Sequence, residues 1–283
     1  MAGTAAIALI SLVGGFSTLP LRTPDPTDVI DLPAATFAYR AAGEYLRDGQ
    51  PVNPPLEATR FNLPIAIMKD HVSRADYERC VAEHACKAIP GLVPANAGDV
   101  AAVGVNWYDA NAYAAWISRK TGHHYRLPTD SEWAYAAADL FHDNTVVADD
   151  GDAANPAKRW LAVYESEAAA SRPKLDSRPQ PFGTYGVNAN GLADVAGNVW
   201  DWTSTCFVRH ATSGATATDM KSCGVRVVEG AHRTYISDFI RDPKGGACSV
   251  GVPPSNLGIR LVRDDGPSGF VARLTTLLRR LAG

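Results

Sequence analysis

The sequence predicts a loop-rich α+β fold, and three observations carry this prediction. The 283 residues include 24 Gly and 19 Pro, which favours turns and irregular loops over a helical bundle. The hydrophobic share of 46% is that of a globular protein with a sizeable core. Short strand-like apolar stretches also alternate with segments that begin with helix-capping residues. The net charge of −3, with both signs mixed, gives no indication of nucleic-acid binding.

The N-terminus predicts export. Residues 1–16 are almost all apolar or small, too few for a membrane span of about 20 residues but suited to a secretory signal. No Lys or Arg precedes this run, so a buried N-terminal element is the alternative. We therefore divide the chain into a leader and linker at 1–28, one domain at 29–264 and a tail at 265–283, and predict a periplasmic or secreted protein.

The five cysteines agree with an oxidising compartment. Cys80 and Cys86 are close in sequence, and Cys206 and Cys223 flank a Thr/Ser/Ala/Gly-rich loop, so two local disulfides are expected, with Cys248 left over. Five reduced cysteines are the alternative. A zinc site is not indicated, because there is no CxxC pair and the histidines are scattered.

Strands are predicted from apolar runs bounded by turn residues. Pro64 marks the second of them as an edge strand or bulge. We expect loops at 41–60 and a long irregular excursion at 141–181. The predicted strands are 31–37, 61–68, 124–128, 182–187, 199–203, 225–228 and 257–262.

Three helices are predicted from their caps. Ser73 begins a helix to about residue 85, Asn106 begins one that Gly122 ends, and Thr129 with Glu132 forms a capping box for a third. The pattern of the tail at 265–283 predicts a basic amphipathic helix, which would lie on a membrane surface, dock a partner or pack on its own domain.

The stretch at 191–203 has the most distinctive pattern of polar, glycine and tryptophan residues in the sequence. It reads GLADVAGNVWDWT, and an extended backbone would direct Trp200 and Trp202 to the same side. Asp194 and Asp201 together with backbone carbonyls of a glycine-containing turn would suit calcium. The alternative is a polar turn with aromatic core residues.

Four segments in order resemble the formylglycine-generating enzyme, or sulfatase-modifying factor, family. The resemblance covers about residues 31–263, and the order and spacing are more specific than any single segment. The segments are VNWYDANAYAAW at 105–116, YRLPTDSEWAYAA at 125–137, NGLADVAGNVWDWT at 190–203 and NLGIRLV at 256–262.

The resemblance implies a single C-type-lectin-like α+β domain and structural calcium. Carried over position by position, one family calcium site falls on Asp194, Gly197, Val199 and Asp201, with Gly197 and Val199 offering backbone carbonyls. The other would lie near Asn155.

One departure from the family concerns its copper ligands. Copper-dependent members hold Cu(I) with two cysteines five residues apart, because thiolates suit a soft ion. The matching positions here are Tyr235 and Ile240, and Glu229 to His232 replace an Arg-Gly-Gly-Ser element. Copper-dependent formylglycine generation is therefore not expected.

The same segment supplies candidate catalytic residues. His232 would ligate a metal or act as a base, Tyr235 would transfer protons or electrons, and Arg241 would hold an anionic substrate; Asp238 lies between them. The alternative is that all four are ordinary polar residues at the rim of a cleft.

Two hypotheses follow. The first is an exported oxidoreductase resembling members such as the pyoverdine-maturation oxidase, with an unknown redox metal and a peptide-like or small secreted substrate. The second is a catalytically silent, calcium-stabilised binding or assembly module, because a fold does not guarantee its family's chemistry.

Overall fold

The computed structural model places most of the predicted domain. The candidate calcium ligand Asn155, Cys248 and the predicted tail helix lie outside the described residues, as does most of the 141–181 excursion. The residues described are 27–89, 100–143, 157–158, 161–162, 164–165, 178–211, 219–243, 254 and 256–266.

The first sheet has four short strands in the order β1-β6-β12-β7. Its central strand β6 (Ile65–Met68) is buried throughout and pairs antiparallel with both β1 (Val29–Leu32) and β12 (Val262–Arg263). β7 (Tyr125–Arg126) closes the other edge. The strand predicted at 61–68 was expected at an edge because of Pro64. This expectation is wrong, because β6 is paired on both sides. Pro64 precedes its first residue, so the missing N–H lies outside the ladder.

The second sheet carries the strands that later form a pocket. Its order is β10 (Thr234–Ser237), β9 (Met220–Glu229), β8 (Trp200–Ala211), β3 (Glu44–Arg47) and β4 (Gln50–Val52), and β11 (Leu257–Gly258) pairs parallel with β8. β3 also runs parallel to β8, so the N-terminal hairpin β3-β4 extends a sheet whose other strands come from the C-terminal half of the chain.

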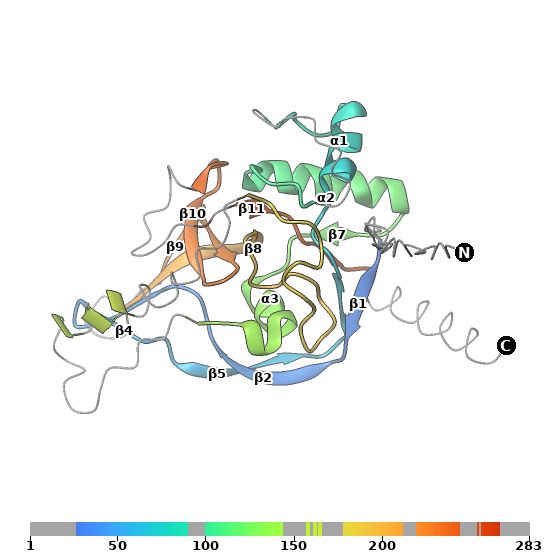
Figure 1. Cartoon of the computed structure of the whole chain (residues 1–283). Coiled ribbons are helices and arrows are strands. Elements are labelled where there is room, and N and C mark those ends of the chain that lie inside the picture. Colours follow the sequence, from blue (N-terminus) through green and yellow to red (C-terminus); the bar gives the residue numbers. More distant parts are fainter. Residues whose placement is uncertain are drawn as a thin grey trace, which may run out of the picture.

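The loop predicted at 41–60 is wrong, because it contains β3, β4 and most of β5 (Leu56–Phe61). β5 pairs with β2 (Ala35–Arg40) in a two-stranded ribbon that curves beneath α3 (Figure 1). The first predicted strand divides at Pro33 into β1 and β2. These strands are half exposed, so their polar residues obscured the alternation that identifies a strand.

The strand predicted at 182–187 is also wrong. Thr184 N donates to Pro181 O at 3.2 Å and Gly186 N donates to Gly183 O at 3.1 Å, which are hydrogen bonds of consecutive turns. Val187 retains only an isolated bridge to Ala193.

The three predicted helices are confirmed with their caps. They are α1 (Arg74–Ala82), α2 (Trp107–Thr121) and α3 (Asp130–Ala137), followed by the short 3₁₀ helix η1 (Ala138–Leu140). Ser73 caps α1, and α2 and α3 begin with complete capping boxes at Asn106 and Thr129. In the described part of the chain, no helix has the length and apolar character needed to cross a membrane.

The core confirms the prediction for the paired tryptophans. Trp200 and Trp202 are both buried in the main hydrophobic cluster, and their indole N–H groups donate to His232 O and Val105 O, each at 2.9 Å. Trp116 and Trp133 are also buried, whereas Trp107 is only partly so. Both expected disulfides, Cys80–Cys86 and Cys206–Cys223, are present.

Candidate functional site

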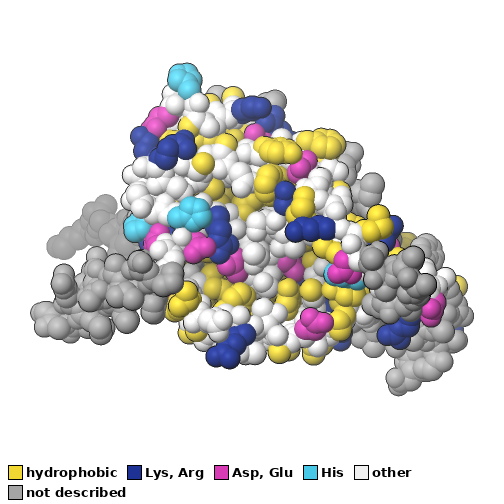
Figure 2. Space-filling model, turned by 180° about the vertical axis from the view of Figure 1, so that it is seen from behind, with side chains coloured by type: hydrophobic (Ala, Val, Ile, Leu, Met, Phe, Trp, Pro, Cys, Tyr) yellow, Lys and Arg dark blue, Asp and Glu magenta, His cyan; other side chains and the backbone are white. Residues whose placement is uncertain are grey.

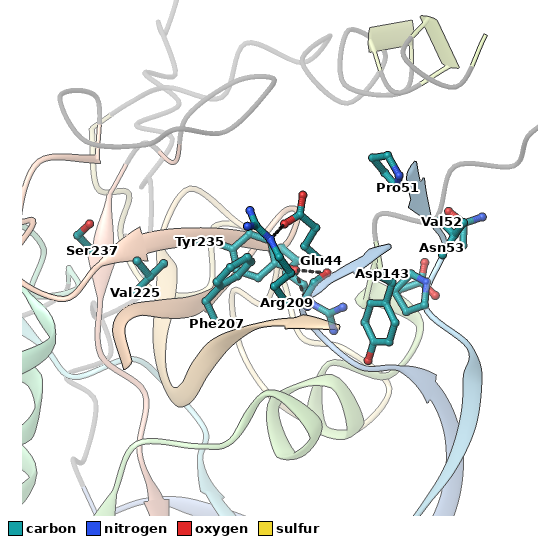
Figure 3. Close-up of a pocket in the computed structure, with 14 residues that line it drawn as sticks. Glu44, Pro51, Val52, Asn53, Asp143, Phe207, Arg209, Val225, Tyr235 and Ser237 are labelled. Carbon is teal, nitrogen blue, oxygen red and sulfur yellow. Dashed lines mark hydrogen bonds and ion pairs between the residues drawn. The ribbon is translucent and has the colours of Figure 1, made fainter. Parts of the chain in front are cut away.

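A cavity of about 610 Å³ lies against the second sheet. Every strand on the path β10-β9-β8-β3-β4 contributes to its wall, so the sheet fixes its shape. We call it the Tyr235 pocket. In Figure 3, Val225 and Ser237 lie at one end, Pro51 and Asn53 at the other, with Phe207 and Tyr235 between them. Its lining residues are Gly43, Glu44, Tyr45, Pro51, Val52, Asn53, Pro54, Asp143, Phe207, Arg209, Val225, Arg233, Tyr235 and Ser237.

Tyr235 joins β10 to the start of β3. Its hydroxyl accepts a hydrogen bond from Gly43 N at 2.8 Å and donates to Gly43 O at 3.3 Å. A Cβ atom at Gly43 would meet Val208 O at 2.7 Å, so the close approach of this backbone to β8 requires glycine. Burial raises the pKa of Tyr235 to about 12, despite the opposing charge of Arg233. The phenol is therefore neutral near pH 7 and positions the pocket wall.

Charged groups in the pocket wall are paired. Glu44 and Arg209 form a partly exposed ion pair at 2.5 Å. Arg233 is buried, with Nε 2.7 Å from Glu229 and Nη2 3.0 Å from Asp130. Burial raises the pKa of Glu229 well above its usual range, and Asp130 adds to this effect. Glu229 and Asp130 thus both pair with the guanidinium of Arg233, which itself lines the pocket.

The structure does not bring the four candidate catalytic residues together, because only Tyr235 lines the pocket. The ring of His232 packs edge-on against Trp200, with a centroid distance of 5.5 Å. Asp238 accepts a hydrogen bond from Tyr108 at 2.8 Å. Arg241 makes two bonds, of 2.7 and 2.8 Å, to Asp109 at the start of α2. These last contacts attach the segment after β10 to the helix.

The candidate calcium residues occupy a buried turn. Asp194 accepts backbone hydrogen bonds from Gly183 at 2.6 Å and Tyr185 at 2.8 Å. With Asn198 and Val199 it borders a cavity of about 10 Å³, which has room for little more than one water-sized particle. Both carboxylate oxygens of Asp194 thus already accept a backbone N–H, so a hard cation in this space would share them with the amides.

Asp201 is already compensated by protein groups. Its Oδ2 accepts from Trp133 Nε1 at 2.9 Å and Arg260 Nε at 3.3 Å. Its Oδ1 lies 3.3 Å from His71 Nε2, within ion-pair range, but has no hydrogen-bond partner among the described residues. Burial raises the pKa of Asp201, yet His71 and Arg260 outweigh burial and hold it at about 2.

Copper does not fit the positions that the family uses for it. Tyr235 lines the pocket, and Ile240 packs against the main hydrophobic cluster. Within the described ranges, His, Cys, Asp and Glu side chains form no group of three that could hold a metal ion.

Sequence reasoning missed most of the pocket wall. Glu44 and Tyr45 lie in a segment predicted as loop, and Phe207 and Arg209 lie beyond the predicted end of the strand at 199–203. The run of residues with high strand propensity from Thr203 to Val208 was the available signal for a longer strand, and alternate residues of that strand, such as Phe207 and Arg209, share a face.

The fold and pocket define a single α+β domain that surrounds a concave site with short strands and long connections. Residues 17–265 match the sulfatase-modifying factor enzyme 1-like domain. Because this match covers most of the chain, the protein belongs to that family.

Two relatives and one solved structure are similar to this chain. The formylglycine-generating enzyme of Streptomyces coelicolor is 31% identical over 180 residues, 60% of this chain and 55% of that enzyme. This chain therefore spans about half the length of that relative. The hercynine oxygenase of Mycolicibacterium smegmatis is 34% identical over 113 residues, 38% of this chain and 22% of the oxygenase. PvdO from Pseudomonas aeruginosa shares the fold, with a TM-score of 0.51 at 22% identity over 83% of this chain and 93% of PvdO.

Proposed function

We propose that this protein is an exported family member that binds a peptide-like or small secreted molecule in the Tyr235 pocket. The observation that carries this proposal is the pocket itself, whose lining includes Arg233, Tyr235 and Ser237 from the segment that the resemblance matches to the family's active site. Aromatic and proline side chains would cover apolar groups of the ligand, and the Glu44–Arg209 pair would bind its polar groups. Two disulfides support a periplasmic or secreted location.

Ligand-dependent stabilisation tests this proposal. A library of short N-acetylated peptides and amino-acid-derived compounds is screened for an increase in Tm, because a ligand bound only by the folded state stabilises it. Val225→Trp should abolish the increase by filling the pocket. The matched control is Val187→Trp, at an exposed position outside the lining, which should respond like wild type. Equal increases in Tm for both variants would show that the ligand does not bind in the Tyr235 pocket.

Oxidation of the bound molecule without copper is the second candidate function. The hercynine oxygenase relative and the position of the pocket favour it. The test combines metal analysis of the purified protein with oxygen consumption in the presence of the compounds that bind. Oxygen uptake that Val225→Trp abolishes would support oxidation, whereas binding without oxygen uptake would leave a catalytically silent binding or assembly module.

We also propose a structural calcium ion held by Asp194, Gly197, Val199 and Asp201. The support for this assignment is the small void beside the buried Asp194, which Val199 also borders. Asp201 does not border that void and already pairs with Arg260, so calcium there would add to an existing ion pair. Treatment with a strong chelator should lower Tm, and added calcium should restore it. An unchanged Tm after chelation would show that the protein holds no stabilising calcium ion, and it would leave the proposal for the Tyr235 pocket unaffected.

A further inference from the structure

The Cys206–Cys223 disulfide lies beside the Tyr235 pocket. It joins β8 to β9 with a Cα–Cα distance of 4.5 Å, and Phe207 and Val225, close to the two cysteines in sequence, line the pocket. Cys206 is buried, whereas Cys223 lies on an exposed part of β9. An incoming thiol therefore reaches Cys223 more readily than Cys206.

Arg226 gives Cys206 an electropositive neighbour. Its Nη1 lies 3.2 Å from Cys206 Sγ and donates to Ser204 O at 2.9 Å, while its guanidinium carbon stands 3.9 Å from the Trp107 ring centroid. The Arg226 Nε is buried and, among the described residues, has no hydrogen-bond partner. Asp238 and Tyr108 also face this guanidinium, and its direct contact with Cys206 Sγ would stabilise an anion on that sulfur.

We propose that Cys206–Cys223 is a thiol-exchange site that accepts electrons from a dithiol or a pair of small thiols. An incoming thiolate forms a bond to Cys223 Sγ while the Cys206–Cys223 bond breaks. The electron pair of that bond passes to Cys206 Sγ, which leaves as a thiolate beside Arg226. A thiol with a lower pKa is the better leaving group, so Arg226 determines which sulfur departs.

The second step completes the exchange. Another thiolate attacks the incoming sulfur of the mixed disulfide and releases Cys223 as a thiolate. The protein has then gained two electrons, and the two incoming thiols have become one disulfide. This exchange is independent of the ligand that the pocket binds.

The other disulfide provides an internal control. Cys80 and Cys86 are both buried at the end of α1. The native protein is equilibrated with graded mixtures of reduced and oxidised glutathione, alkylated and mapped by mass spectrometry. Cys206–Cys223 should be reduced while Cys80–Cys86 stays intact, and the glutathione adduct should form on Cys223. An adduct on Cys206, or equal reduction of both disulfides, would overturn the proposal.

Two substitutions at Arg226 separate its charge from its packing. In a Cys223→Ser background, the pH dependence of alkylation should give Cys206 a pKa below the ordinary thiol value of about 8.5. Arg226→Gln should raise that pKa in this background and, with both cysteines present, slow the exchange several-fold, while Arg226→Lys should retain most of both effects. If Arg226→Gln does not fold, an ordinary pKa for Cys206 with Arg226 present would still refute the proposal.

Discussion

At the scale of single residues, two of the four candidate catalytic side chains make hydrogen bonds that join distant segments of the chain. Arg241 attaches the segment after β10 to Asp109, and Asp238 pairs with Tyr108. Sequence alone identified this segment but not its contacts, because the partners lie about 130 residues away in the chain. A polar side chain in a family's active segment therefore needs its partners identified before it is given a catalytic role.

Tyr235 illustrates the difference most clearly. Tyr235→Phe removes the hydroxyl that bonds both the N–H and the C=O of Gly43, so partly buried backbone groups lose a partner. We expect a loss of about 1–3 kcal/mol in the free energy of unfolding, measured with urea. Tyr45→Phe is the control, because the Tyr45 ring keeps its stack on His210. Equal stability of Tyr235→Phe and wild type would show that these hydrogen bonds are not structural.

At the scale of elements, capping residues predicted the helices well, whereas the strands near residue 50 escaped detection. A cap is a local signal that one residue and its next neighbours carry. β3, by contrast, owes its existence to pairing with β8, and Glu44 meets Arg209 across that pair. Only the folded chain brings these segments together, so composition could not place this wall of the pocket.

The end of α2 offers a test of the capping argument. Gly122 has φ +73°, and a side chain added there would meet no atom within 4 Å. Gly122→Ala should therefore cost about 1–2 kcal/mol through backbone strain alone. Gly122→Asn should cost less, because Asn tolerates this conformation better. Urea unfolding of both variants checks the order, and an Asn variant as unstable as the Ala variant would contradict the explanation.

At the scale of the whole molecule, Arg260 links segments that are far apart in sequence. It donates to Lys69 O at 2.6 Å and Ala193 O at 2.8 Å, and it pairs with Asp201 on β8. The family resemblance predicted the overall fold, yet it assigned Asp201 only to calcium and gave no sign of this buried pair. The buried Asp201–Arg260 pair differs from the charges on the surface, where Lys and Arg are interspersed with Asp and Glu on the face shown in Figure 2.

The Asp201–Arg260 pair should govern acid stability. The pKa of Asp201 is depressed to about 2 in the folded protein, so its contribution is present above the unfolded value of about 4 and is lost as pH falls through 2. Asp201→Asn should cost about 3–5 kcal/mol at pH 7 by leaving Arg260 uncompensated. The difference from wild type should shrink between pH 4 and 2. Glu57→Gln, on an exposed part of β5, should show no such change.

We infer that the Tyr235 pocket, on the second sheet, is the functional site. Hydrogen exchange with and without the peptide that most raises Tm tests it directly. Binding should slow exchange in β3 and β10 and leave α2 unchanged, because the pocket is built from the strands of that sheet. Protection confined to the helices, with β3 and β10 exchanging as in the free protein, would show that the peptide binds outside the Tyr235 pocket.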